Sequence, residues 1–294
     1  MDKNTITGFV LIAALIIGFS WFNKPSDEEI AQQRTQDSIA NVQKEKAKQQ
    51  QAANAAAAKA MAKIDTTAAF HEALAGKAQK VTLKNQKVEL TFNSKGATVE
   101  KAVIKGFKDY KGNKDVTLFD GKDQSLNFML AGKETNLITS DMYFTPSEVT
   151  DSTVVFTASA TEGKSLTISY TLGKDYMLHA SIQANGMSGM FAPNYNAMDV
   201  EWKDKCRQQE KGFTFENRYA TLTYHLTEGG TDYLGETKEL TDEAVEDNID
   251  WVAFKNQFFS AVMIAKNDFG KNAKMTSIPQ EKGSGYLKQY LSLI

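Results

Sequence analysis

Cysteine is nearly absent from this chain, which has Cys206 as its only thiol among 294 residues. A single cysteine cannot form an internal disulfide or build a multi-cysteine zinc site. Histidine is almost as scarce: His71, His179 and His225 lie far apart, and none has a second ligand at metal-binding spacing. The sequence therefore predicts no metal ligands, and it leaves the redox compartment undecided.

Enzyme motifs are also missing. Gly283-Ser284-Gly285-Tyr286 lacks the third glycine of a dinucleotide-binding loop, and there is no phosphate loop, nucleophile elbow or His-Glu-x-x-His helix. Cys206 has basic neighbours of the kind that activate a thiol, but no histidine lies near it in sequence, so we interpret it as an ordinary thiol. We predict no catalytic, cofactor-binding or metal-binding residues, and a chain that is not an enzyme.

No charge of one sign dominates the composition. The 34 lysine and arginine residues nearly balance the 36 aspartate and glutamate residues, so no whole-molecule field attracts nucleic acid. Four lysines recur around Phe107 and Tyr110, namely Lys105, Lys108, Lys111 and Lys114. Because Asp109 and Asp115 lie among them, the segment favours a solvated loop over a nucleic-acid patch.

Long apolar runs are limited to the N-terminus. Residues 4–23 are twenty consecutive uncharged positions, and a helix of that length spans about 30 Å, the thickness of a bilayer core. The run ends in Gly18-Phe19-Ser20-Trp21-Phe22-Asn23, which lacks the small-x-small pattern of a cleaved signal peptide. We therefore predict a retained transmembrane anchor at residues 1–23, whose orientation the flanking lysines do not fix.

Residues 24–80 are rich in alanine, glutamine and lysine and have few helix breakers between Pro25 and Gly76. Their apolar residues do not repeat at spacings of three and four, so no coiled coil is indicated. The segment predicts a solvated, largely helical tether that reaches about 85 Å if wholly helical.

From residue 81 to 294 the pattern changes to the period of two that is typical of strands. Residues 88–92 and 166–172 alternate apolar with polar side chains, and Gly173-Lys174-Asp175 supplies a turn before residues 178–184 alternate again. Residues 166–184 therefore predict a β-hairpin.

Two later segments, residues 249–254 and 258–265, are apolar on both faces, which predicts buried central strands. The acidic segment that precedes them, residues 236–248, favours a loop or a short surface helix. Many short strands with frequent turns predict a mainly β sandwich and not an alternating α/β fold.

Several segments resemble the YidC-type membrane protein insertases. The start Met1-Asp2-Lys3-Asn4 with its anchor and tether is similar to the start of that family. The resemblance is stronger at residues 93–102 (NSKGATVEKA), at residues 170–176 (TyrThrLeuGlyLysAspTyr), and at Trp251-Val252-Ala253 with Gln257-Phe258-Phe259-Ser260-Ala261. These segments match the order and spacing of the family's large periplasmic domain.

The resemblance implies a first helix with its N-terminus inside and its C-terminus outside, in the bacterial inner membrane. It implies a periplasmic β-supersandwich similar to sugar-mutarotase folds. The family's insertase activity belongs to a downstream bundle of five membrane helices, and no residue of this chain corresponds to the groove in that bundle. The chain stops at Ile294 where the family continues with further strands. We therefore expect a truncated sandwich that is marginally stable and aggregates when alone.

The resemblance makes a membrane protein insertase component the leading hypothesis: a protein that assists insertion and folding of inner-membrane proteins, alone or with the Sec translocon. Its partners would be the lipid bilayer, nascent inner-membrane proteins and translocon components. The alternative is a membrane-anchored carbohydrate-binding or mutarotase-like protein, which needs a histidine and a carboxylate in one cleft, with His179 or His225 as the histidine. A third reading is an anchored chaperone or scaffold that binds extended segments at a sheet edge.

Overall fold

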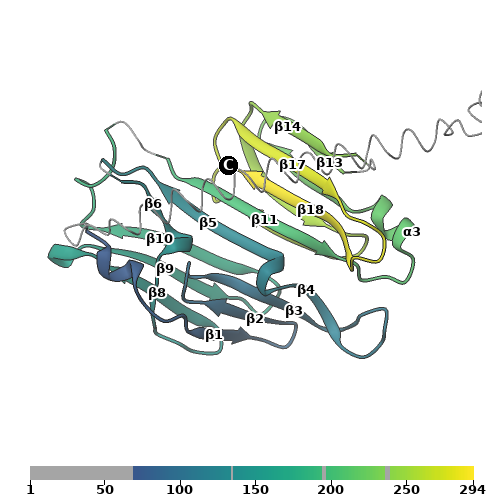
Figure 1. Ribbon diagram of the computed structural model, residues 1–294, viewed down its shortest axis with the longest axis horizontal. Helices are drawn as coiled ribbons and strands as arrows, with labels where there is room; N and C mark the ends of the chain where they lie inside the picture. The colour runs from purple at the N-terminus through teal and green to yellow at the C-terminus, as the bar shows by residue number, and fades with distance from the viewer. Residues whose placement is uncertain (1–68, 134, 194–196, 236–238) are drawn as a thin grey trace, which may run out of the picture. The chain divides into compact units, whose positions relative to one another are not determined.

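The computed structural model describes residues 69–133, 135–193, 197–235 and 239–294. The predicted anchor and the tether up to residue 68 lie outside this part of the chain. Within it, none of the helices has the length and apolar character needed to span a bilayer. The described residues form four antiparallel sheets, which confirms the prediction of a mainly β sandwich (Figure 1).

Two four-stranded sheets form the first half of the domain, in the orders β1-β2-β3-β4 and β10-β9-β8-β7. Their strands are β1 (Lys80–Lys84), β2 (Val88–Asn93), β3 (Thr98–Lys108), β4 (Asp115–Asp120), β7 (Thr145–Ser147), β8 (Thr153–Ser159), β9 (Ser165–Leu172) and β10 (Leu178–Asn185). Alternate side chains of β2, β8 and β9 point inward, so this half buries an apolar core centred on Phe92, Phe156 and Tyr170.

The predicted hairpin at residues 166–184 is confirmed. β9 and β10 pair antiparallel with Leu172 opposite Leu178, and the Asp175 carboxylate accepts a hydrogen bond from the Met177 backbone N–H at 2.9 Å in the turn. The alternation of apolar and polar residues fixes such a register, because a slip of one residue would move every apolar side chain to the wet face.

The second half pairs a six-stranded sheet, β14-β17-β18-β11-β5-β6, with a four-stranded sheet, β13-β12-β15-β16. Their strands are β5 (Gln124–Leu130), β6 (Leu137–Ile138), β11 (Asp199–Arg207), β12 (Thr221–Leu226), β13 (Thr231–Leu234), β14 (Thr241–Val245), β15 (Ile249–Lys255), β16 (Ser260–Ile264), β17 (Ala273–Pro279) and β18 (Tyr286–Leu293). Between the two sheets lies a second core, which includes Trp202 stacked on Phe254 at 3.9 Å.

In the described ranges a short helix precedes β1 and others connect the strands. They are η1 (His71–Leu74), η2 (Gly121–Asp123), η3 (Thr139–Asp141), η4 (Thr161–Gly163) and α3 (Phe213–Arg218). Phe70 and Ala73 are buried in the first core, so packing begins before the boundary predicted at residue 80.

β11 links the two halves, since Val200 near its start belongs to the first core, and Trp202 and Cys206 belong to the second. Figure 1 shows β11 between β5 and β18 in the large sheet. β18, which ends at Leu293, is hydrogen-bonded to β17 on one side and to β11 on the other. The last strand is therefore not an edge strand, and the free edges of the sheets belong to other strands.

Two predictions for the second half are wrong. Residues 236–248 contain the strand β14, which pairs with β17 at the edge of the large sheet, and not a loop or surface helix alone. The acidic composition did not indicate a strand, although an edge strand exposes one side to water and can carry acidic residues. The segment 258–265 is not a central buried strand: it contains β16, an edge strand on which Val262 is 49% and Ile264 55% exposed. The other apolar segment, β15, is central and mostly buried, as predicted.

Candidate functional site

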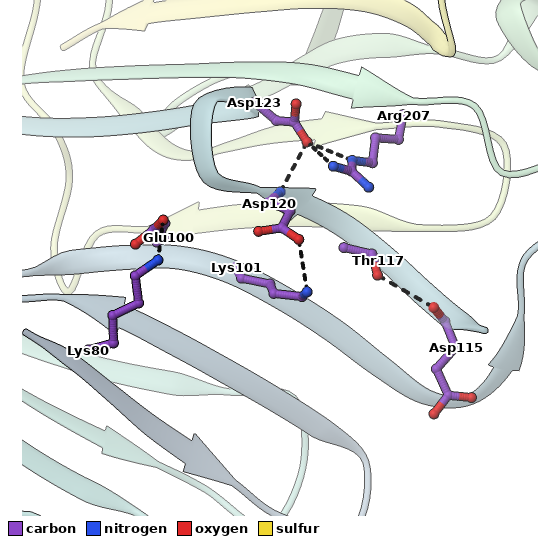
Figure 2. A network of polar contacts seen from close by, with 8 residues as sticks. All are labelled: Lys80, Glu100, Lys101, Asp115, Thr117, Asp120, Asp123 and Arg207. Atoms are coloured by element: carbon purple, nitrogen blue, oxygen red, sulfur yellow. Dashed lines mark hydrogen bonds and ion pairs between the residues drawn. The ribbon is translucent and has the colours of Figure 1, made fainter.

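A buried carboxylate, Asp123, ties the connection between β4 and β5 to the large sheet. It is 7% exposed, and its Oδ2 accepts hydrogen bonds from Arg207 Nε at 2.6 Å and from the Asp120 backbone N–H at 3.0 Å. The Tyr286 hydroxyl donates to its Oδ1 at 2.6 Å. Figure 2 shows Arg207 reaching from β11 to this carboxylate. Because the carboxylate is satisfied by three donors, we interpret this group as a structural clamp.

The other ion pairs of Figure 2 lie on the surface of the first half. Lys80 pairs with Glu100 at 2.7 Å, and Lys101 pairs with Asp120 at 2.8 Å. Exposed pairs of this kind contribute about 0–1 kcal/mol each. They form no cleft and carry no catalytic arrangement.

Buried ionisable groups gather in the second core beside the clamp. Burial raises the pKa of Asp204 to about 8, with Asp123 adding to the shift and Arg207 opposing it. Burial lowers the pKa of Lys288 to about 8. These residues lie on the neighbouring strands β11 and β18. The recess that Asp204 lines with Asn256 and Ala261 has room for about one water molecule, so no substrate of ordinary size fits there.

Cys206 is buried on β11, and burial raises the pKa of its thiol, with Asp204 and Glu216 adding to the shift. A nucleophilic cysteine needs a lowered pKa and access to substrate. The position of Cys206 in the core thus matches the interpretation as an ordinary thiol.

The three histidines are dispersed in the structure as they are in the sequence. His71 lies in η1, and His179 is exposed on β10. His225 on β12 has its Nδ1 3.0 Å from Asp250 Oδ2 and stacks on Trp251. Thr227 donates to the same carboxylate at 2.7 Å, and this hydrogen bond, followed by His225, lowers the pKa of Asp250.

The carbohydrate alternative requires such a histidine–carboxylate pair inside a cleft. His225 lies on the face of β12 opposite the buried Tyr224, and Asp250 is the unpaired residue of a β-bulge between the pairs His225–Trp251 and Leu226–Ile249. Both side chains are 31% exposed, so the pair lies at the surface of the sheet. Over the ranges that the structure describes, no three histidine, cysteine or carboxylate side chains are grouped as metal ligands.

The lysines at residues 105–114 lie on β3 and its loop to β4. Lys108 pairs with Asp115 at 2.7 Å, and Lys111 lies over the Tyr110 ring. Phe107 and Tyr110 are exposed, and the Phe107 ring meets Phe259 edge-on at 5.7 Å. The prediction of a solvated loop holds only for residues 109–114, because residues 105–108 belong to β3. The end of β3, at Phe107, contacts the turn that precedes β16.

The exposed apolar edge of β16 was not predicted from the sequence. An uninterrupted apolar run predicts burial on both faces, and no local signal separates a core strand from an exposed edge of the same composition. Val262 lies beside Ala253 and Ile264 lies beside Trp251 on the outer face of β15, while Phe258 in the preceding turn is 65% exposed.

Comparison with known proteins places this fold. The model of the YidC periplasmic domain matches residues 80–293. The chain belongs to the YidC family. The YidC-type resemblance drawn from the sequence is therefore confirmed.

Proteins named membrane protein insertase YidC match almost the whole chain. The protein from Phocaeicola vulgatus is 48% identical over 99% of this chain and 47% of its own length. That from Bacteroides fragilis is 41% identical over 99% of this chain and 47% of its own length, and that from Porphyromonas gingivalis is 33% identical over 98% and 47%. The chain thus spans about half the length of these YidC relatives, and their names support the insertase reading over the carbohydrate alternative.

A similar solved structure is that of a galactose mutarotase-like protein from Lactobacillus casei. It is 14% identical, covers 73% of this chain and 87% of its own, and superposes with a TM-score of 0.47. At this level of similarity the likeness says nothing about the chemistry of this YidC-family chain.

Proposed function

We propose that this chain is the anchor and periplasmic domain of a membrane protein insertase, which assists insertion and folding of inner-membrane proteins alone or with the Sec translocon. The observation that carries the proposal is the match of residues 80–293 to the YidC periplasmic domain, together with relatives that are named insertases and align over 99% of this chain. The proposed partners are the lipid bilayer, nascent inner-membrane proteins and translocon components. The chain acts without catalysis or cofactor.

In this proposal residues 1–23 cross the inner membrane once, with the N-terminus inside. The predicted tether, residues 24–80, follows, and its last residues pack on the β domain. The β domain lies in the periplasm as a supersandwich. The sequence supports the span, because residues 4–23 are uncharged and long enough to cross the hydrocarbon core. A bilayer anchor keeps the β domain close to the place where polar flanks of client proteins leave the hydrocarbon, which is the costly step of insertion.

Depletion of the protein in its own bacterium tests the proposed function. The readout is protease access to the periplasmic loop of a newly made inner-membrane protein, with a secreted soluble protein as the control. We expect the loop to become inaccessible while secretion of the soluble protein is unchanged. Unchanged insertion, or equal loss of both proteins, would contradict the proposal.

Alkaline phosphatase fusions test the topology separately. A fusion after Ile294 should be active and a fusion before the anchor inactive, because the enzyme folds only outside the cytoplasm. The reverse pattern would overturn the orientation without touching the family assignment.

A further inference from the structure

The free edges of the four sheets differ in how they are protected against pairing with other chains. Edge strands present unpaired N–H and C=O groups, and proteins guard them with charges, prolines, short length or polar outer faces. Charged residues lie on four of the eight edge strands: Lys80 and Lys84 on β1, Asp115 and Asp120 on β4, Asp232 on β13, and Asp242 and Glu243 on β14. β7 contains Pro146, and β6 has only two residues.

The edge strands β10 and β16 have no such charge or proline and are longer than β6, and they differ in the polarity of their outer faces. On β10 the exposed outer residues are His179, Ser181 and Gln183. On β16 they are Val262 and Ile264, and the strand has neither a charge nor a proline over Ser260–Ile264. β16 is therefore the one described edge that combines an uncharged sequence with large exposed apolar side chains.

The edge of β16 is also held in place. In the part of the chain that the structure describes, β16 pairs only with β15, and no other strand or helix runs alongside it. Its inward side chains, Ala261 and Met263, pack against both hydrophobic cores. The preceding turn is fixed by Asn256, whose Oδ1 accepts hydrogen bonds from the backbone N–H groups of Phe258 and Phe259. A rigid edge lowers the ordering cost of binding an extended segment.

The charge around β16 indicates what kind of segment fits. At the end where β16 begins, Lys255 lies opposite Ser260. In residues 105–115, Lys105 pairs with Glu89 and Lys108 pairs with Asp115, and Lys111 and Lys114 outnumber the remaining aspartate, Asp109. The Phe107–Phe259 contact places the end of β3, just before the lysine-bearing loop, against the turn that leads into Ser260. An excess of positive charge at that end favours acidic residues in the partner and disfavours a second copy of the same edge.

We propose that the free edge of β16 is a docking site at which an extended, apolar segment with an acidic end, contributed by a client polypeptide, pairs as an added strand. Backbone hydrogen bonds to the edge supply affinity for any extended chain. Val262, Ile264 and Trp251 select apolar side chains on one face, and the lysines select the acidic end. The inference rests on the proposed function only for the identity of the partner as a client.

A peptide titration on the purified 294-residue chain in detergent tests this site. The probe is a short synthetic peptide that alternates valine and threonine and carries two aspartates at one end, with a fluorescent label for anisotropy. Amide hydrogen exchange of β16 is measured in the same samples. We expect saturable binding and slowed exchange of the β16 amides when the peptide is present.

Two variants place the binding on this edge. Val262→Lys should weaken the peptide about tenfold or more, because it introduces the charge that guards the other edges. Val262→Thr should weaken it less, and Ser181→Lys on β10 should leave it unchanged. The fold of each variant is checked by its thermal unfolding curve. A peptide with proline in place of a central threonine should bind weakly, since it loses a ladder hydrogen bond, and a peptide with lysines in place of the aspartates should also bind weakly.

Several outcomes would overturn the proposal. They are no saturable binding, equal loss in Val262→Lys and Ser181→Lys, or a concentration-dependent dimer that Val262→Lys abolishes, because the edge would then bind a second copy. Slow exchange of all β16 amides without peptide would show that the chain covers its own edge. None of these results bears on the insertion assay, so failure of this site and failure of the proposed function are distinguishable.

Discussion

The two halves of the domain differ in what they bury. In the first half the core is built from apolar and aromatic side chains, and the hydroxyl of its buried tyrosine, Tyr170, donates to the Ala97 carbonyl at 2.9 Å. The second half buries Asp204 and Lys288 beside its aromatic residues. Burial of such groups costs free energy unless every charge and hydrogen bond is satisfied. The difference suggests that the first half supplies stability and that the second half gives some of it up.

The two halves also differ in the side chains that their edge strands expose. In the first half the edge strand β10, next to β9, presents polar side chains. In the second half the edge strand β16 presents Val262 and Ile264. An exposed apolar edge strand promotes aggregation of a soluble domain, but it can also bind an extended partner segment. The second half, which has the more polar interior, therefore also has the edge strand with the more apolar exposed side chains.

Truncation of the first core should have the largest effect. Phe156 is fully buried against Phe92 and Tyr170, with ring centroids 6.0 and 6.3 Å away. Phe156→Ala should lower the free energy of unfolding by about 3–5 kcal/mol, because it removes buried area and leaves a cavity. Urea unfolding of the 294-residue chain measures the change. A loss below about 1 kcal/mol would mean that the first half is not the stable one.

The second core should make stability depend on pH. The folded-state pKa of Asp204 is raised from 3.8 to about 8. The unfolded chain therefore releases this proton first, so the contribution of Asp204 is fully present below pH 3.8 and is lost as the pH rises toward 8. Since one pKa unit corresponds to about 1.4 kcal/mol, the decline should be clear in unfolding curves.

Asp204→Asn provides the control for that pH dependence. An amide does not ionise, so the variant should lose most of the decline between pH 4 and 8 and be more stable than the parent chain at pH 8 and above. Identical pH profiles for parent and variant would show that Asp204 ionises in the folded state as it does in water.

The buried tyrosine of the first core should have a smaller effect. Tyr170→Phe removes a single hydrogen bond to the Ala97 carbonyl and leaves the ring packing unchanged. We expect a loss of about 1 kcal/mol in the free energy of unfolding, which is typical of one buried hydrogen bond. An unchanged value would indicate that water replaces the tyrosine hydroxyl at that carbonyl.

Substitutions on the two edges should affect stability least. Val262→Lys on β16 and Ser181→Lys on β10 both lie at exposed positions, so each should change the free energy of unfolding by about 0.5 kcal/mol or less. Thermal melts of both variants beside the parent measure this. If Val262→Lys destabilised the chain strongly, Val262 would belong to the core and the contrast between the edges would disappear.

Sequence reasoning predicted the first half better than the second. The β9–β10 hairpin was predicted correctly, because the alternation over residues 166–184 specifies both strands and their inner faces. β14 was missed and β16 was assigned to the core, since neither acidic composition nor an apolar run tells which strand ends a sheet. Edge position is decided by pairing between distant segments, such as β14 with β17, and no local pattern encodes that pairing.

The candidate site was unpredictable for the same reason. Phe258, Val262 and Ile264 appeared in sequence as core residues, and only the sheet order β13-β12-β15-β16 shows that they lie on an open edge. The clamp at Asp123 joins residues from η2, β11 and β18, which are far apart in the chain. The family, in contrast, was accessible from short segments, because their order and spacing are carried by the sequence itself.

Site-specific photo-crosslinking in inner membranes tests most directly whether the second half binds clients. A photoreactive residue is placed at position 262 on β16 or at position 181 on β10, while an inner-membrane protein is being synthesised. We predict crosslinks to the nascent protein from position 262 and few or none from position 181. Equal crosslinking from both positions, or crosslinking from position 181 alone, would contradict the assignment of the binding edge to β16.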